Sequence, residues 1–137
     1  LFDEIVVAVL NNADKHPMVS VDERCQMPRE ILPTVETDGC KMLVESLSGL
    51  TADFAKRSGA TAIVRGIRAV SDYEYELRMA LMNRRLEPTI ETVFLMAGEE
   101  YSYVSSTLMK QVFELGGRVE GLIPELVENR MRAKLEK

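Results

Sequence analysis

The sequence predicts an α/β fold built on a doubly wound parallel sheet with helices on both faces. Two observations favour this class. Short apolar, often β-branched runs alternate with longer segments of helical character along the whole chain. The first run, residues 5–10 (IVVAVL), is apolar throughout, which is typical of a strand covered on both faces.

Residues 5–10 are therefore the first expected strand, and residues 11–17 (NNADKHP) read as a polar loop. Ser20 and Glu23 have the spacing of a capping box, so a helix is expected to begin directly after Ser20. Pro28 lies inside this helical pattern and is expected to kink the helix or end it early.

The second strand candidate covers residues 42–45. Thr51 is expected to cap a short helix over residues 51–57, which Gly59 ends. A third strand is expected over residues 61–65, which ends on Arg65, and the loop after it carries Gly66 and Arg68.

Ser71 and Glu74 read as a second capping box, which opens a helix that runs to about Leu86. The remaining elements are a strand, a helix with serine at one end and glycine at the other, and a last helix that begins with proline: residues 92–96, 105–117 and 124 onwards.

Composition limits the possible functions. The 137 residues suit one domain with its own core, and 46% hydrophobic and 28% charged residues are ordinary for a soluble protein. A net charge of −5 argues against a general nucleic-acid or anionic-membrane surface. Cys25 and Cys40 are interpreted as free thiols of a cytoplasmic protein, with one disulfide as the open alternative. No apolar run is long enough to span a bilayer.

Groups suited to phosphate follow the expected strands, where ligands bind in this fold class. Lys15 follows the first strand, and Arg65 and Arg68 flank Gly66 after the third. Three hydroxyl residues, 105–107, stand at an expected helix N-terminus, where free N–H groups and the helix dipole favour anions. Three cationic groups on adjacent loops would suit a polyphosphate.

Plainer interpretations of these residues stay open. A serine of the hydroxyl group could serve only as a helix cap, and the arginines could be solvated surface side chains. The helix over residues 72–86 carries two apolar stripes. Tyr73, Leu77, Ala80 and Leu81 form the stripe expected to face the core. Tyr75, Met79, Met82 and Leu86 form the second, either a subunit contact, further core, or the wall of a pocket for a flexible ligand.

No nucleophile–base pair is evident, since neither cysteine lies near His16, the only histidine. An enzyme with this sequence would act by positioning its substrates and stabilising charge, as nucleotidyl transfer allows.

Two long segments, VRGIRAVSDYEYELRMALMNRRL and ETVFLMAGEEYSYVSSTLMKQV, closely resemble bacterial phosphopantetheine adenylyltransferases, and DKHPMVSVDER resembles the lysine loop of that family. The resemblance implies a Rossmann-like nucleotidyltransferase fold in a cytoplasmic homohexamer. It implies transfer of an adenylyl group from ATP to 4′-phosphopantetheine with Mg²⁺, giving dephospho-coenzyme A and pyrophosphate in coenzyme A biosynthesis. Coenzyme A itself is a further expected ligand, and neither nucleic acid nor membrane is an expected partner.

The same resemblance implies roles for individual residues. Lys15 and Arg65 would hold the phosphate of phosphopantetheine, and Thr51 falls at a position that contacts the same substrate. The pantetheine arm would be lined by Tyr75, Met79, Met82 and Asn83. The ATP site would comprise Gly66, Ile67, Arg68, Glu76 and the loop Tyr101, Ser102, Tyr103, Val104, Ser105, Ser106 and Thr107.

The family's opening strand, its Gly-Thr-Phe-Asp-Pro loop and its Gly-His motif have no counterpart here, and His16 does not match the motif. The transition-state-stabilising histidine is therefore expected before Leu1, and no catalytic residue is predicted within the chain. Two alternatives remain: a nucleotidyltransferase with a different phosphate acceptor, or a catalytically inactive nucleotide-binding module.

Overall fold

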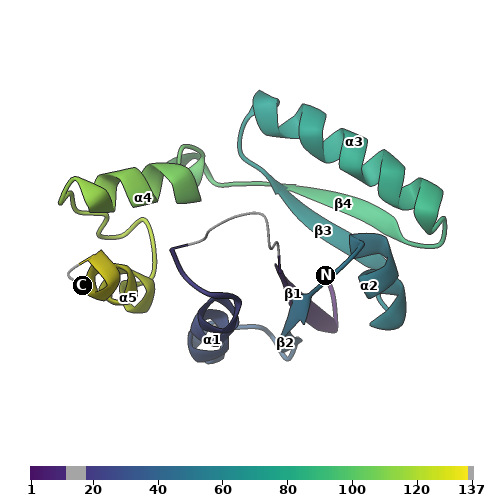
Figure 1. The fold of residues 1–137 in the computed structure, drawn as a ribbon. Helices are drawn as coiled ribbons and strands as arrows, with labels where there is room; N and C mark the ends of the chain where they lie inside the picture. Colours follow the sequence, from purple (N-terminus) through teal and green to yellow (C-terminus); the bar gives the residue numbers. More distant parts are fainter. Residues whose placement is uncertain (12–17, 136–137) are drawn as a thin grey trace. The chain divides into compact units, whose positions relative to one another are not determined.

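A computed structural model describes residues 1–11 and 18–135 and divides the chain into two compact units (Figure 1). One unit comprises Leu1–Ser48 and Ser105–Lys137, and the other comprises Gly49–Val104. The expectation of a single domain stays a prediction. None of the described helices has both the length and the apolar composition needed to cross a membrane.

The first unit is built on two parallel strands, β1 (Glu4–Leu10) and β2 (Lys41–Leu47). Their register runs from Glu4 opposite Lys41 to Leu10 opposite Leu47. Both predicted strands are confirmed, but β2 is longer than the predicted 42–45. Ladder hydrogen bonds to β1 extend it over polar residues, such as Ser46, that have little strand propensity of their own.

Helix α1 (Val21–Ile31) connects these strands and begins with the predicted capping box. The Ser20 hydroxyl accepts a hydrogen bond from the Glu23 N–H, and a Glu23 carboxylate oxygen accepts one from the Ser20 N–H. Of the two effects expected of Pro28, an early helix end is wrong, because the helix continues to Ile31, and a kink stays a prediction. The carbonyl of Pro28 accepts from the Leu32 N–H, and Arg29 donates to the Val44 carbonyl of β2 at 2.9 Å, so tertiary contacts hold the last turn.

Helices α4 (Ser106–Glu114) and α5 (Glu125–Leu135) complete this unit. Ion pairs join α5 to α1, from Lys134 to Glu23 at 2.6 Å and from Arg130 to Glu30 at 2.7 Å. The buried apolar residues of the unit come from β2, from its three α-helices and from the loops beside them, and none comes from β1: Val19, Cys25, Met27, Val44, Leu47, Met109, Phe113, Val119 and Met131. Cys25 and Cys40 are both free thiols, as predicted.

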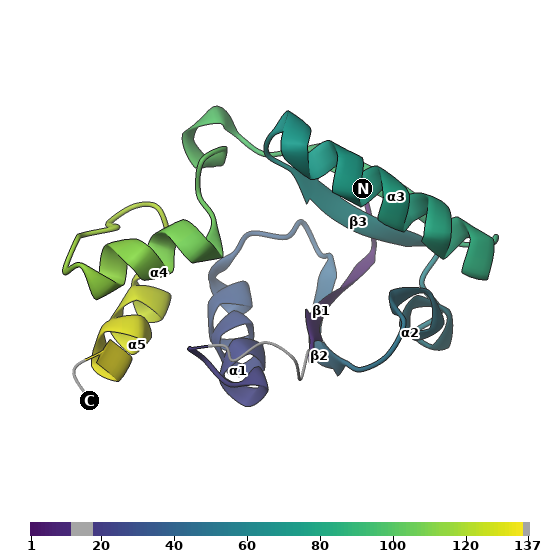
Figure 2. The same ribbon diagram turned by 45° about the horizontal axis from the view of Figure 1, so that its top comes forward.

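The second unit holds parallel strands β3 (Ala62–Ile67) and β4 (Glu91–Met96), with helices α2 (Thr51–Arg57) and α3 (Val70–Leu86). Figures 1 and 2 both show α3 lying along this strand pair. A 3₁₀ turn, η2 (Glu99–Tyr101), follows β4. The alternation of strands and helices with parallel pairing confirms the predicted Rossmann-like α/β class.

Two local predictions in this unit are wrong. Thr51 is the first residue of α2 rather than its cap, because Leu50 occupies the N-cap position without a side-chain hydrogen bond. The capping box of Ser71 and Glu74 does not form, because α3 begins earlier, with Ala69 as its N-cap. The carboxylate that turns back at this helix start belongs to Asp72.

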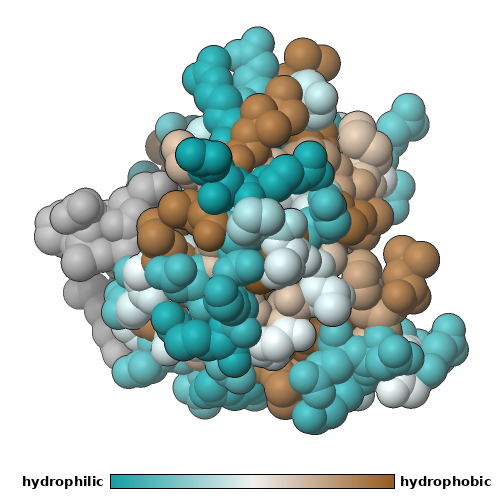
Figure 3. Space-filling model, turned by 90° about the vertical axis from the view of Figure 1, so that its right-hand side faces the viewer, coloured by the Kyte–Doolittle hydropathy of each residue, from teal (hydrophilic) through white to brown (hydrophobic). Residues whose placement is uncertain are grey.

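The predicted core-facing stripe of α3 is also wrong. Of its four members, Tyr73, Leu77 and Leu81 are exposed, although Tyr73 packs edge-on against Phe94 with ring centroids 6.3 Å apart. The two side chains that α3 buries, Glu76 and Asn83, are both polar. Figure 3 shows hydrophobic residues at the surface among hydrophilic ones in the upper part of its view.

Candidate functional site

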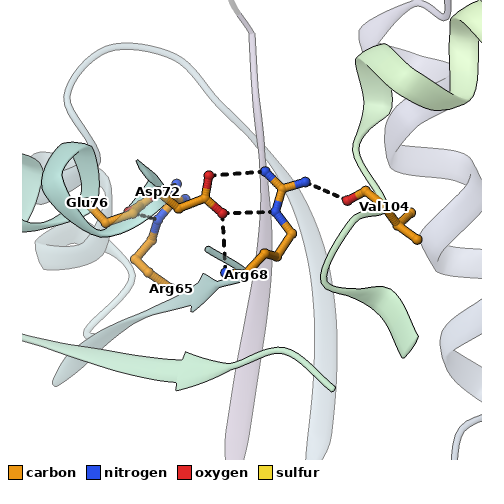
Figure 4. Close-up of polar contacts among 5 residues, drawn as sticks. All are labelled: Arg65, Arg68, Asp72, Glu76 and Val104. Atoms are coloured by element: carbon orange, nitrogen blue, oxygen red, sulfur yellow. Dashed lines mark hydrogen bonds and ion pairs between the residues drawn. The ribbon is translucent and has the colours of Figure 1, made fainter. Parts of the chain in front are cut away.

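The candidate site lies at the C-terminal end of β3 and the first two turns of α3 (Figure 4). The sequence predicted that the strand ends at Arg65, but β3 continues through Gly66 and Ile67. Arg65 is therefore a strand residue, and only Arg68 follows the strand. The difference arises because residues 62–67 are paired along their whole length with β4, which Arg65 and Gly66 join as ladder residues.

Arg65 is held by a carboxylate from α3. Its Nε donates to Glu76 Oε2 at 2.7 Å and its Nη2 donates to Glu76 Oε1 at 2.6 Å, a two-pronged pair. The Glu76 side chain is only 10% exposed, whereas that of Arg65 is 50% exposed. The hydrogen bond to Glu76 is the largest cause that raises the pKa of Arg65 above its usual value. Arg65 thus stays charged while both N–H groups of Nη1 have no partner among the described residues.

Arg68 makes a wider set of contacts. Its Nε donates to Asp72 Oδ2 at 3.1 Å and its Nη2 to Asp72 Oδ1 at 3.4 Å, while Nη1 donates to the Val104 carbonyl at 2.5 Å. The backbone N–H of Arg68 also donates to Asp72 Oδ2, at 3.2 Å. The hydrogen bond from Arg68 is the main reason that the pKa of Asp72 is lowered. Figure 4 shows this guanidinium between the α3 carboxylate and the loop carbonyl.

Gly66 lies between the two arginines, and its environment is open. A Cβ placed at Gly66 would meet no atom within 4 Å, and its φ is not in the left-handed region. Nothing in the described chain therefore requires glycine here. A ligand that approaches the backbone closely would supply such a requirement.

The remaining predicted substrate residues of this unit lie on α3 and α2. Tyr75, Met79 and Met82 are exposed along one side of α3, whereas Asn83 is buried two turns after Glu76. Thr51 is partly exposed at the start of α2. The second apolar stripe is thus available to a ligand or a partner, and Asn83 belongs to the inner face of the helix.

The loop after β4 is held by short-range hydrogen bonds. The Ser102 hydroxyl donates to the Glu99 carbonyl at 2.9 Å, and the Val104 N–H donates to the Tyr101 carbonyl at 3.0 Å. Tyr101 and Tyr103 expose their rings. The loop is therefore a compact turn with aromatic side chains at its surface, tied to the rest of its unit through Arg68.

In the other unit, the predicted hydroxyl cluster stands at the start of α4. Ser105 is the N-cap, and its hydroxyl accepts from the Leu108 N–H at 3.1 Å, which is the plainer of its two interpretations. Ser106 and Thr107 are exposed in the first turn. Lys15 and His16 lie outside the described residues. Within residues 1–11 and 18–135, no group of three or more His, Cys, Asp or Glu side chains could hold a metal ion.

Asp72 is the site residue that sequence reasoning missed. An acidic side chain suits the first turn of a helix whatever the function, so its residue type alone carries no functional signal. The available signal was its spacing of four residues from Arg68, although that spacing also fits an ordinary surface pair. The Val104 carbonyl has no sequence signal, because any residue supplies one.

Comparison with known proteins defines the class and then the family. Residues 1–112 match the family model described as cytidylyltransferase-like, so the chain carries a nucleotidyltransferase-like domain. It is 48% identical to the phosphopantetheine adenylyltransferase of Oleidesulfovibrio alaskensis over 134 aligned residues. The aligned region covers 98% of this chain and 76% of that protein.

Further relatives carry the same name. Identity is 46% to the protein of Nitratidesulfovibrio vulgaris strain DP4, over 98% of this chain and 70% of the relative. It is 41% to the protein of Caldanaerobacter subterraneus subsp. tengcongensis, over 100% of this chain and 83% of the relative. The chain belongs to the phosphopantetheine adenylyltransferase family.

Proposed function

We propose that this chain transfers the adenylyl group of ATP to 4′-phosphopantetheine, giving dephospho-coenzyme A and pyrophosphate in the coenzyme A pathway. The observation that carries the proposal is identity of 41–48% to phosphopantetheine adenylyltransferases over 98–100% of the chain. A pair of arginines at the end of a parallel strand, where α/β folds bind ligands, supports it chemically.

The reaction needs no nucleophile from the protein. An oxygen of the 4′-phosphate attacks the α-phosphorus of ATP and forms a new P–O bond, while the bond from the α-phosphorus to the α,β-bridging oxygen breaks and releases pyrophosphate. What the protein must supply is alignment of two highly charged substrates and stabilisation of the charge that moves between them. Permanently charged, forked arginines suit both tasks.

The division of labour between the two arginines is the one that the family resemblance implies, and the way each arginine is held agrees with it. Arg65 keeps the Nη1 edge of its guanidinium for the acceptor's 4′-phosphate, while Glu76 fixes the opposite edge. Lys15 is the second cation proposed for that phosphate. Gly66, Ile67 and Arg68 are proposed to line the ATP site, with Arg68 on the phosphates and Ser105, Ser106 and Thr107 as further donors. Tyr101–Val104 would cover the nucleotide.

Glu76 is proposed to lie in the ATP site, and it also holds the guanidinium of Arg65. Its two oxygens already accept from Arg65, and its side chain is nearly buried. A contact with ATP would use the remaining lone pairs of those oxygens, since a carboxylate can accept up to about four hydrogen bonds.

The apolar side of α3 suits the uncharged pantetheine arm. Tyr75, Met79 and Met82 offer flexible or flat apolar surface that can follow a thiol-ended chain. Asn83 and Thr51 complete the proposed contacts to the acceptor. This is the pocket-wall interpretation of the second stripe.

Mg²⁺ is proposed to arrive with ATP, held mainly by phosphate oxygens and water, as is common for this ion at nucleotide sites. The protein is further proposed to work in the cytoplasm as a homohexamer, which rests on the family resemblance. The many exposed apolar side chains of α3 agree with a surface that a second copy covers. Light scattering of the purified protein would measure the assembly.

The function is tested by pyrophosphate release from the purified protein with ATP and Mg²⁺. Turnover is expected with 4′-phosphopantetheine, and none with pantetheine, which lacks the attacking phosphate. Nicotinate mononucleotide is a second control, because it is a phosphate acceptor without a pantetheine arm. Turnover with the mononucleotide and not with phosphopantetheine would reassign the substrate.

A further inference from the structure

The carboxylate of Asp72 makes three contacts with a single residue. It accepts from the Nε and Nη2 of Arg68, and one of its oxygens also accepts from the Arg68 backbone N–H. Asp72 lies in the first turn of α3, whereas Arg68 precedes the helix. The pair therefore spans the junction between β3 and α3. It fixes both the main chain and the side chain of Arg68.

The other end of the Arg68 guanidinium reaches the loop after β4. Nη1 donates to the Val104 carbonyl at 2.5 Å, across 36 residues of sequence. At the start of the loop the Ala97 N–H donates to the Ile67 carbonyl, whereas the other hydrogen bonds within the loop, among the described residues, are local, such as those from Ser102 to Glu99 and from Val104 to Tyr101. Arg68 thus connects the end of the loop to a distant part of the sequence. Asp72 sets the direction of the Arg68 side chain.

We propose that Asp72 is a positioning residue for ATP: it aims Arg68 and, through Arg68, holds the Tyr101–Val104 loop in place for the nucleotide. The proposal rests on the adenylyl-transfer function above and adds a residue that does not itself touch the substrate. It explains why a carboxylate stands beside an arginine that is proposed to bind the phosphates of ATP, where a negative charge would otherwise weaken anion binding.

Two possible roles of Asp72, neutralising Arg68 or positioning it, predict opposite changes in ATP affinity when Asp72 is removed. If Asp72 only neutralised Arg68, its removal would leave a stronger positive charge and tighten ATP binding. If Asp72 positions Arg68, its removal frees a side chain with large rotamer entropy and loosens the loop, so ATP binding weakens. The direction of change in the KM for ATP separates the two.

The test compares Asp72→Asn with Glu74→Gln in the purified enzyme. Both changes remove one negative charge from α3, but Glu74 is exposed and pairs only with Arg78, at 3.9 Å. Asp72→Asn is expected to raise the KM for ATP roughly tenfold, the size of one charge-assisted contact. The KM for phosphopantetheine should change less than about twofold, and Glu74→Gln should change neither.

Hydrogen exchange supplies a readout that does not need activity. Asp72→Asn should speed amide exchange in residues 98–104, where the Tyr101, Ser102 and Val104 amides are hydrogen-bonded, and leave exchange in β3 and β4 unchanged. Arg68→Lys should produce the same local change. Adding Asp72→Asn to Arg68→Lys should then cause little further loss, because the two residues act in series.

Each outcome decides the proposal. A lower or unchanged KM for ATP in Asp72→Asn overturns it, as does unchanged exchange in the loop. Faster exchange throughout the unit shows a purely structural role and also overturns it. If the parent enzyme releases no pyrophosphate, the adenylyl-transfer function fails, while the exchange comparison still tests whether Asp72 fixes the loop through Arg68.

Discussion

Two arginines three residues apart are each held by a carboxylate of α3, yet the two ion pairs differ in burial and reach. Glu76, the partner of Arg65, has a side chain only 10% exposed, and the pair joins β3 to the inner face of α3. Asp72, the partner of Arg68, is 26% exposed, and its pair extends to the Val104 carbonyl.

This difference separates stability from positioning. A nearly buried carboxylate depends on its cation, because an unpaired charge is costly where water is scarce. A more exposed pair contributes little to stability but can still fix the direction of a side chain and a loop. The same chemistry one helical turn apart can thus serve the fold at one position and the ligand at the other.

The largest expected effect comes from Arg65→Ala. Loss of the guanidinium leaves Glu76 without its partner and should lower the free energy of unfolding by about 1–3 kcal/mol. The affinity for phosphopantetheine should fall roughly 10- to 100-fold, because a charge-assisted phosphate contact disappears. Urea denaturation and calorimetric titration measure the two effects.

The double variant Arg65→Ala with Glu76→Gln separates them. Removing the orphaned charge should restore much of the stability, whereas the affinity for phosphopantetheine should stay low. Recovery of both would mean that Arg65 acts on the acceptor only through the fold.

Arg68→Lys is expected to have a smaller effect on stability, within about 1 kcal/mol, because its pair is more exposed. The charge remains, but the lysine lacks the fork that reaches Asp72 and Val104 together. The KM for ATP should rise roughly tenfold, with little change in the KM for phosphopantetheine. Equal rises in both constants would contradict the division between the two arginines.

Gly66→Ala tests the backbone between the arginines. The added methyl group meets no atom of the described chain within 4 Å, so thermal stability should be unchanged or slightly higher. ATP affinity should fall by several-fold if a phosphate approaches the backbone here. A variant with normal stability and normal ATP affinity would remove Gly66 from the nucleotide site.

The smallest expected effect is the loss of folding stability at low pH. It compares an ion-paired carboxylate in each of the two units. The hydrogen bond from Lys134 is the main reason that the pKa of Glu23 falls to about 2 from a usual 4.5. The stabilisation is therefore present above pH 4.5 and is lost as the pH falls toward 2. The lowered pKa of Asp72 acts in the same direction in the second unit.

Glu23→Gln is the matched variant, because glutamine can keep the capping box with Ser20 while losing the charge that attracts Lys134. In thermal unfolding from pH 7 down to pH 2, the melting temperature of this variant should fall less steeply at acid pH than that of the parent protein. If the melting temperatures of the two proteins fell equally with pH, the ion pair would contribute nothing to stability.

Local patterns predicted the fold well where the partners lie close in sequence. The Ser20–Glu23 capping box formed as expected because its atoms are three residues apart. The Ser71–Glu74 pattern has the same letters but did not form, because Asp72 turns back toward Arg68 and α3 begins at Val70. Strand β3 passed its predicted end because pairing with β4 outweighs the weak strand propensity of Gly66.

The site was predicted in part for the same reason. The two arginines and Gly66 were singled out because residue type and position at the end of a strand indicate phosphate chemistry, whereas the loop at Tyr101 was implied only by the family resemblance. The pairing of Arg65 with Glu76 and the reach of Arg68 to Val104 were missed. Both depend on how α3 and the loop pack on the strands, across 11 and 36 residues, which no local pattern encodes.

The most direct test of the central claim is calorimetric titration of the parent protein, Arg65→Ala and Arg68→Lys with each substrate in turn. A crossed result is expected: Arg65→Ala loses affinity for phosphopantetheine and keeps it for ATP, and Arg68→Lys does the reverse. Equal losses for both ligands in both variants, or no binding of either ligand by the parent protein, would contradict it.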